Sequence, residues 1–283
     1  MNAPPRQLTV EHHDRDAAGM TYVYPVVSRR AGGVSVGINL NPNNACNWRC
    51  VYCQVPDLVR GGPPPIALDQ LKVELENLLD QIQNGDFLQQ RVPADARHLV
   101  DVAFSGNGEP TSAAEFAEAV KIVAGVLARR HLTGKIPLRL ITNGSLIRRT
   151  TVQDGVRNLA AAGGEVWFKV DAVTSATTRR INNTRTSPES LRTRLELCIS
   201  LCPTWVQTCV FSMDGHAPPA EEVDAYIALL GGMSGKLGGV FLYGLARPSL
   251  QPEAARLSNL SAAWMETLAT RLRQQGLTVR VNP

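Results

Sequence analysis

The sequence of 283 residues predicts an α/β fold built on parallel strands. Segments with the apolar spacing of strands and of helices alternate about six times along the chain, with no internal repeat and no convincing linker. Parallel strands joined by helices form either an open doubly wound sheet or a barrel. Several expected strands carry polar or small residues at every second position, whereas a strand buried on both faces would be apolar throughout. A barrel whose interior holds a ligand accounts for this pattern, and we expect one.

The composition suits a cytoplasmic protein with a full hydrophobic core. Apolar residues make up 44% of the chain, and only 5% of the residues are aromatic. The formal net charge of +4 is too small to indicate nucleic-acid binding by itself. No apolar run approaches the roughly 18 residues of a membrane span, and residues 1–16 contain no apolar core of a secretion signal. The six cysteines of so long a chain do not resemble a disulfide scaffold, so a reducing compartment is expected.

The expected strands follow from alternation and from turn residues. In residues 34–40, four apolar side chains alternate with Ser35, Gly37 and Asn39, so the apolar set should face packed helices. Residues 1–30 are polar and irregular, and we expect an N-terminal extension to one domain that spans residues 31–283. Strands are expected at 99–105, 137–142, 166–171, 205–211 and 240–243, with weaker ones at 21–27 and 278–282.

The expected helices follow from apolar residues three and four positions apart. They lie at 68–82, 116–127, 152–159, 188–201, 220–230 and 261–275. Gly85 and Gly276 end two of them, and Ser187 caps a third before Pro188. The stretch Thr111–Glu115, in which Ser112 and Glu115 are three residues apart, has the spacing of a capping box at the start of the helix at 116–127.

Three cysteines lie within eight residues, directly after the strand at 34–40. Cys46, Cys50 and Cys53 are separated by three and then two residues, and no fourth cysteine or histidine follows closely. Three thiolates on one loop can hold three corners of an inorganic cluster and leave one position open. A zinc site completed by a distant ligand, or cysteines that merely pack, are the alternatives.

This spacing, with the aromatic Tyr52 before the last cysteine, resembles the signature of the radical S-adenosylmethionine (radical SAM) superfamily. The resemblance implies a partial (β/α)6 TIM-like barrel and a [4Fe-4S] cluster whose unique iron chelates S-adenosylmethionine. It also implies reductive cleavage of that cofactor to a 5′-deoxyadenosyl radical, which abstracts hydrogen from a substrate. Reduced flavodoxin or ferredoxin would supply the electron. The alternative is an iron–sulfur or zinc-binding protein without turnover.

The ends of the next strands carry further residues that match the family. Gly106, Asn107, Gly108 and Glu109, followed by Pro110, resemble the motif that binds the methionine amino group of the cofactor, although an ordinary turn is the alternative. Thr142 and Asn143 resemble the third-strand motif, where they would hold ribose hydroxyls or fix a turn.

Lys169 and Asp171 share the inward face of a strand end. By the resemblance, Lys169 would bind the cofactor carboxylate and Asp171 the ribose. A structural ion pair is the alternative, because two buried charges are costly unless they pair or meet a ligand.

Substrate contacts are expected from the last two strand ends, at Gln207, Tyr243 and Arg247. The substrate itself is not identified by the sequence: a small molecule, a peptide and an RNA base all stay open. RNA binding would use a basic stretch, Arg179, Arg180 and Arg185, although a solvated charge run is an equal alternative.

Cys198 and Cys202 fall on the apolar stripe of one expected helix, so we expect them to pack in the core. Cys209 would line the barrel, and an auxiliary cluster from all three is the less favoured alternative. Within the superfamily the chain resembles the tRNA wyosine-base synthases most. Those enzymes carry a second cluster on upstream cysteines, and no cysteine precedes Cys46, so we do not expect their reaction.

Overall fold

A computed structural model of the chain describes residue 8, residues 19–28 and residues 32–283. The predicted extension, residues 1–30, falls largely outside these described residues, and its boundary stays a prediction. Its last part forms β1, which pairs antiparallel with β2 and so belongs to the main sheet. The described residues contain no helix that is both long enough and apolar enough to cross a membrane.

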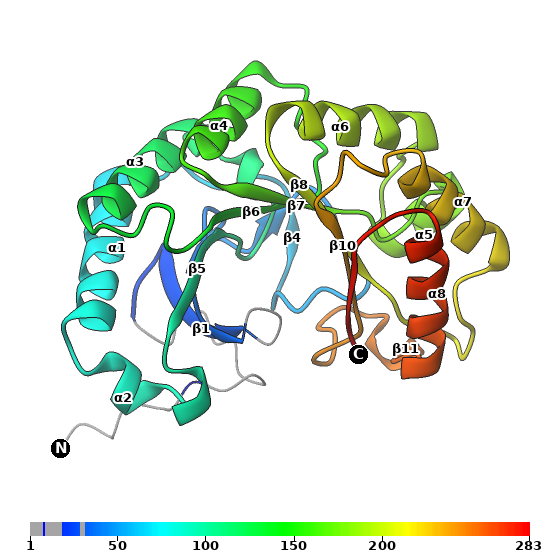
Figure 1. The fold of residues 1–283 in the computed structure, drawn as a ribbon, viewed down its shortest axis with the longest axis horizontal. Coiled ribbons are helices and arrows are strands. Elements are labelled where there is room, and N and C mark those ends of the chain that lie inside the picture. Colours follow the sequence, from blue (N-terminus) through cyan, green and yellow to red (C-terminus); the bar gives the residue numbers. More distant parts are fainter. Residues whose placement is uncertain (1–7, 9–18, 29–31) are drawn as a thin grey trace.

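One eight-stranded sheet organises the chain, in the order β1-β2-β5-β6-β7-β8-β10-β12. Apart from the pair β1–β2, all neighbouring strands of this sheet are parallel to each other. The sheet curls into an arc whose two ends, β1 and the C-terminal strand, do not meet (Figure 1). The predicted partial barrel of parallel strands is therefore confirmed. Its strands are β1 (Val23–Ser28), β2 (Gly33–Ile38), β5 (Leu99–Phe104), β6 (Leu138–Thr142), β7 (Glu165–Lys169), β8 (Thr204–Cys209), β10 (Gly239–Tyr243) and β12 (Val279–Asn282).

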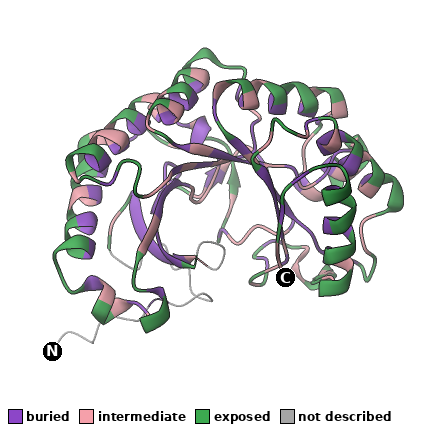
Figure 2. Cartoon of the chain, viewed as in Figure 1, coloured by how far each residue is buried: buried purple, intermediate pink, exposed green. Residues whose placement is uncertain are grey.

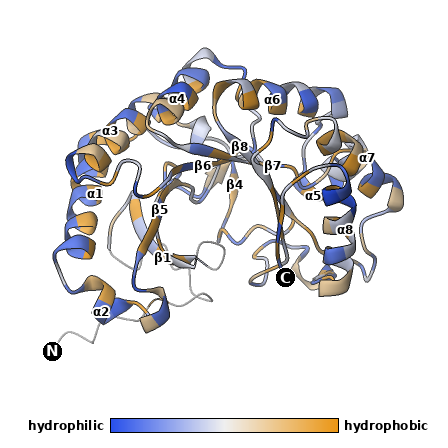
Figure 3. Ribbon diagram, viewed as in Figure 1, coloured by the Kyte–Doolittle hydropathy of each residue, from blue (hydrophilic) through white to orange (hydrophobic). Residues whose placement is uncertain are grey.

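The helices cover the convex side of the arc. Figure 2 shows buried residues on their inner faces and exposed residues outside, and Figure 3 shows the matching apolar and hydrophilic faces. This is the division that the three-and-four spacing predicts. The helices are α1 (Leu68–Gln83), α2 (Phe87–Arg91), α3 (Phe116–Arg129), α4 (Thr150–Ala161), α5 (Ser175–Asn182), α6 (Pro188–Leu201), α7 (Ala220–Gly231) and α8 (Ala262–Gln274).

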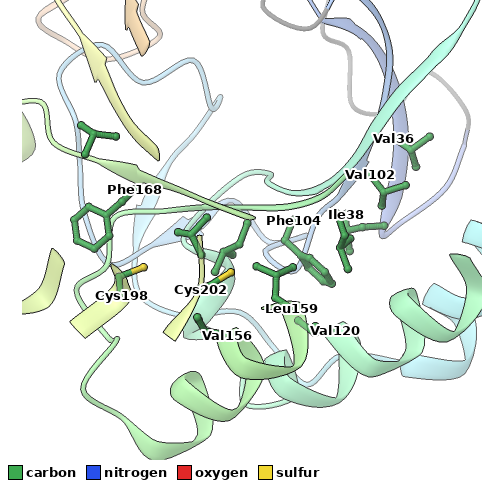
Figure 4. Close-up of a cluster of buried hydrophobic side chains, with 14 of the residues drawn as sticks. Val36, Ile38, Val102, Phe104, Val120, Val156, Leu159, Phe168, Cys198 and Cys202 are labelled. Carbon is green, nitrogen blue, oxygen red and sulfur yellow. The ribbon is translucent and has the colours of Figure 1, made fainter. Parts of the chain in front are cut away.

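The two faces of each strand have different surroundings. Val34, Val36 and Ile38 are fully buried in the core between the sheet and the helices, as their alternation predicts. Ser35 points to the inside of the arc, where it donates a hydrogen bond to Asp101. The inner face is therefore free to carry polar side chains, while the outer face supplies the apolar core shown in Figure 4.

Three local expectations were wrong. Arg179 and Arg180, expected in a loop, lie in the last turn of α5, and the short helix α2 was not expected at all. The capping box is absent: Glu115 is the N-cap residue of α3 without a side-chain bond, and Thr111 and Ser112 lie in the short 3-10 helix Pro110–Ser112. Their hydroxyls donate to Glu109 instead, Thr111 to its carboxylate and Ser112 to its backbone carbonyl, both at 2.6 Å.

Two small sheets shape the loops beside the strand ends. The strand β3 (Ala45–Cys46) pairs parallel with β4 (Val59–Arg60), and β9 (Ser212–Met213) pairs antiparallel with β11 (Leu257–Ser258). The first of these closes the segment that contains the three cysteines.

The core between sheet and helices makes a prediction about stability. Phe104 is fully buried and packs edge-to-face on Phe116, with 5.9 Å between ring centroids. We expect Phe104→Ala to lower the free energy of unfolding by about 3–5 kcal/mol, because the surrounding core cannot fill the cavity. Val73 is 53% exposed, so Val73→Ala should change it by less than about 0.5 kcal/mol. Urea denaturation followed by circular dichroism measures both, and equal effects would contradict this assignment of the core.

Candidate active site

A cavity of about 340 Å³ lies inside the arc and reaches the carboxyl ends of the strands. Because the strands are parallel, these ends share one edge of the sheet. Every residue predicted for the site lines this cavity except Thr142 and Asp171, which lie directly behind its wall. The predicted cluster, cofactor and substrate residues are thus brought together at one place.

The cysteine loop, residues 44–61, carries Cys46, Cys50 and Cys53. All three thiols line the cavity. The ends of the loop are joined by backbone hydrogen bonds, from Val59 to Asn44 at 3.1 Å and from Gly61 to Cys46 at 3.0 Å. Within the loop, the Cys53 amide donates to the Cys50 carbonyl at 3.0 Å.

The carboxyl end of α5 holds the cysteine loop from one side. Val51 donates its amide to the Ile181 carbonyl at 2.8 Å, and the Asn183 side chain donates to the Arg49 carbonyl at 2.8 Å. The Asn182 side chain donates to the Cys50 sulfur at 3.2 Å. Asn183 adopts a left-handed conformation (φ 52°), which asparagine tolerates better than most residues and which ends the helix here.

A segment near the C-terminus holds the loop from another side. The Ser249 hydroxyl donates to the Val51 carbonyl at 2.7 Å, and the Leu250 amide donates to the Cys53 carbonyl at 2.9 Å. Arg49 forms a two-point ion pair with Glu253, at 2.9 and 2.7 Å. Paired donors of this geometry fix both the distance and the orientation of the loop.

The three thiols are half-buried as well as gathered. Burial raises the pKa of the Cys46 thiol to about 11 and that of the Cys50 thiol to about 12. A metal therefore has to displace these two protons in order to bind. Among the described residues no three His, Cys, Asp or Glu side chains are placed to hold a single metal ion. A [4Fe-4S] cluster bonds each thiolate to a different iron, so three cysteines on one loop can supply three of its four ligands.

The loop after β5 packs too closely on its neighbours for any residue except glycine at two positions. A Cβ atom on Gly106 would lie 2.3 Å from the Asn39 side-chain oxygen, and one on Gly108 would lie 2.1 Å from the Ala45 carbonyl. Between them, the Asn107 amide donates to the Asn39 side chain at 3.1 Å. The Gly-x-Gly pattern thus brings the backbone of this loop against the end of β2 and the start of the cysteine loop.

Glu109 is the centre of a hydrogen-bond network at the cavity wall. Its carboxylate is 2% exposed and accepts from the Thr111 amide (3.2 Å) and hydroxyl (2.6 Å), the Thr142 hydroxyl (2.6 Å) and the Asn143 amide (2.7 Å). Burial raises the pKa of Glu109, and these bonds oppose the rise. Thr142 and Asn143 thereby fix the turn after β6, one of the two roles expected for them.

Asn143 also connects this turn to the cysteine loop. Its side-chain amide donates to the Asn47 side chain at 2.9 Å, and Asn47 in turn donates to the Ser145 hydroxyl at 2.7 Å. The ends of β5 and β6 and the cysteine loop therefore form one connected unit.

Lys169 and Asp171 are paired, with 3.6 Å between the Lys169 ammonium nitrogen and an Asp171 carboxylate oxygen. The Tyr52 hydroxyl lies between them: it accepts from Lys169 at 2.6 Å and donates to Asp171 at 2.5 Å. Burial is the largest influence on the pKa of Lys169 and would lower it, but the Asp171 carboxylate and the other acidic groups around it together raise the pKa, so the ammonium form persists. Burial also raises the pKa of Tyr52, so its hydroxyl stays protonated.

Deeper in the cavity lies a charged group that the sequence reasoning missed. Arg139 forms ion pairs with Asp101 and, at 2.7 Å, with Glu165, and its guanidinium lies 4.6 Å from the Trp167 ring centroid. The Trp167 indole nitrogen donates to Glu165 at 3.0 Å. Asp101 and Arg139 occupy inward positions of their strands. A charged residue at an inward strand position is the feature of the sequence that could have predicted this group.

The remaining cysteines do not gather. Cys198 and Cys202 pack in the main core beside Phe168 and Leu159, as expected (Figure 4). Cys209 lies in a separate apolar cluster with Val51, Phe211 and Met213. In the described part of the chain these three thiols therefore offer no common ligand site.

Comparison with known proteins supplies the family. A family model, the Radical SAM superfamily, matches residues 40–230. UPF0026 protein MJ1312 from Methanocaldococcus jannaschii is 30% identical over 159 residues, which cover 56% of this chain and 42% of that protein. The GTPase Obg from Brachyspira hyodysenteriae is 29% identical over 126 residues, which cover 44% of this chain and 15% of that protein. The chain thus spans less than half the length of both curated relatives.

Among solved structures, a radical SAM methyltransferase from Sphaerobacter thermophilus shares the fold, with a TM-score of 0.57 and 12% sequence identity. The match covers 92% of this chain and 68% of that one.

The Glu109 network makes a prediction that needs no cofactor. All its neighbours are donors, so Glu109→Gln would place an amide NH₂ against one of them. We expect it to lower the free energy of unfolding by about 1–3 kcal/mol, the cost of a mispaired buried polar group. Glu118 is exposed and meets only Lys121 at 3.1 Å, so Glu118→Gln should cost less than about 0.5 kcal/mol. Denaturation of both variants measures this, and a neutral Glu109→Gln would show that the network does not depend on the carboxylate.

Proposed function

The chain belongs to the radical SAM superfamily, and we propose that it holds a [4Fe-4S] cluster on Cys46, Cys50 and Cys53 and cleaves S-adenosylmethionine reductively. When bound, the cluster and cofactor supply a 5′-deoxyadenosyl radical, which abstracts hydrogen from a substrate. The observation that supports this most is that three half-buried thiols from one short loop line the same cavity as the polar strand ends.

The cofactor would bind between the cysteine loop and the ends of β5, β6 and β7. The Glu109 carboxylate is already engaged by four donors, so peptide carbonyls of Gly106, Asn107 and Gly108 are the better acceptors for the methionine ammonium group. Glu109 then acts by fixing these peptides. Lys169 lines the cavity and can donate to the methionine carboxylate, while Asp171 is kept from the cavity by Tyr52 and holds Lys169 in place.

The substrate would enter from the far side of the cavity, where Gln207, Tyr243 and Arg247 line the wall. The enclosed walls favour radical chemistry because they limit access of water and of stray hydrogen donors. Reduced flavodoxin or ferredoxin is proposed as the electron donor. The Sphaerobacter structure is named as a methyltransferase, and the sequence resembles the wyosine-base synthases. Neither likeness identifies the substrate of this chain.

The first test is cluster binding. Protein reconstituted without air should hold about four irons per chain, and after reduction it should convert S-adenosylmethionine to 5′-deoxyadenosine. Cys50→Ala and Cys53→Ala should lose both properties, because each removes one of three ligands. Cys198→Ala should keep both, because Cys198 lies in the core. Iron and sulfide analysis and chromatography of the nucleoside are the measurements.

The alternative is a metal-binding protein without turnover. It predicts bound zinc, or an iron–sulfur cluster with no affinity for S-adenosylmethionine. Either result with the reconstituted protein would overturn the proposed function.

The second test concerns Lys169. Lys169→Met should weaken binding of S-adenosylmethionine to the cluster-loaded protein at least tenfold, because the carboxylate of the cofactor loses a charged donor. Lys121 is exposed on α3, and Lys121→Met should leave affinity unchanged. Isothermal titration under anaerobic conditions compares the two. Unchanged affinity of Lys169→Met would remove Lys169 from the cofactor site.

A further inference from the structure

One side chain outside the sequence motifs reaches a cysteine sulfur. Asn182, the last residue of α5, is 1% exposed. Its amide nitrogen lies 3.2 Å from the Cys50 sulfur and 3.1 Å from an Asp171 carboxylate oxygen. Both neighbours are acceptors, so the side chain has to point its NH₂ group, and not its carbonyl, at them. The two N–H bonds of one amide therefore serve two different partners.

The position of Asn182 is fixed by the backbone as well. Its carbonyl accepts from the Arg49 amide at 3.3 Å, and the neighbouring Ile181 carbonyl accepts from Val51. These bonds hold the end of α5 on both sides of Cys50. The Asn182 amide is therefore presented to the sulfur in a fixed orientation, without competition from solvent.

We propose that Asn182 is a positioning residue that raises the reduction potential of the cluster through its hydrogen bond to the Cys50 sulfur. The proposal rests on the cluster proposed above. Reduction adds one electron to the cluster, with no change of ligands, and makes the cluster and its thiolates one unit more negative. A donor that bonds to the sulfur stabilises the more negative state more strongly, and hydrogen bonds to sulfur are among the determinants of cluster potentials. Burial strengthens this effect, because water does not screen the bond.

The bond also connects the cluster ligand to the proposed cofactor-binding group. Asn182 and Tyr52 donate to the same Asp171 oxygen, and Lys169 donates to Tyr52. A hydrogen-bond chain thus runs from the Cys50 sulfur to the Lys169 ammonium. The sequence motifs supply the two ends of this chain, and Asn182 supplies the link to the sulfur.

The test is a redox titration of the reconstituted protein without S-adenosylmethionine, poised with mediator dyes and followed by electron paramagnetic resonance. Asn182→Leu removes both bonds with little change of size. Asn182→Asp keeps the shape but, as a carboxylate, has no donor for the sulfur, and its negative charge shifts the potential in the same direction as the lost bond. In both variants we expect the ratio of reduced to oxidised cluster at a fixed potential to fall about threefold to tenfold, where tenfold equals about 59 mV for a one-electron couple.

The matched control is the next residue. Asn183→Gly removes the side-chain bond to the Arg49 carbonyl, keeps the left-handed backbone and touches no sulfur. It should leave the ratio unchanged.

An equal shift in Asn183→Gly, or an unchanged ratio in Asn182→Leu or Asn182→Asp at full iron content, would overturn the proposal. So would loss of the cluster from both Asn182 variants while Asn183→Gly retains it, since Asn182 would then serve assembly and not potential. If the wild-type protein binds no cluster, the proposed function itself fails. That result differs from all the outcomes above, in which the wild-type protein holds its cluster.

Discussion

The cysteine loop has little regular structure of its own, and its shape depends on hydrogen bonds from distant parts of the chain. The end of α5, the segment at residues 249–253 and the turns after β5 and β6 each contact it. These contacts come from segments that are far apart in the sequence. The loop can therefore adopt its shape only after most of the barrel has formed. A rigid scaffold that positions an irregular loop is the usual way in which a protein places reactive groups. The site and the fold therefore cannot be separated in this chain.

The charged side chains buried near the site need compensating partners. A buried carboxylate or ammonium group is strongly unfavourable unless donors or an opposite charge surround it. Glu109 meets this cost with four donors, and Arg139 meets it with two carboxylates. The carboxylates that pair with Arg139 come from the two neighbouring strands, and two of the four donors to Glu109 come from the end of β6. The polar interior therefore adds contacts between strands that the apolar outer face cannot supply.

The fold and the centre of the site were predictable because they follow from local patterns. Alternation in residues 34–40 and the apolar stripes of the helices have one physical solution, which is burial of the apolar face. The Gly-x-Gly pattern likewise has a steric cause that the structure makes explicit at Gly106 and Gly108. Partners that depend on tertiary contact were not predictable. Asn182 lies in a helix with a weakly apolar sequence, and nothing in its neighbourhood indicates that its amide reaches Cys50. The failed capping box has the same origin, because the hydroxyls of Thr111 and Ser112 both bond to Glu109.

The contacts of Tyr52 explain why a tyrosine stands in the cysteine motif. Tyr52 comes two residues after Cys50 and one before Cys53, and its ring packs on Phe211, with 5.5 Å between centroids. From there its hydroxyl reaches between Lys169 and Asp171, which are otherwise 3.6 Å apart on the inner face of the barrel. A phenylalanine would fill the same space but would leave an acceptor for Lys169 and a donor for the fully buried Asp171 carboxylate missing. The motif therefore joins the thiols to the charged end of β7, and the spacing of the cysteines is what brings the tyrosine hydroxyl to that position.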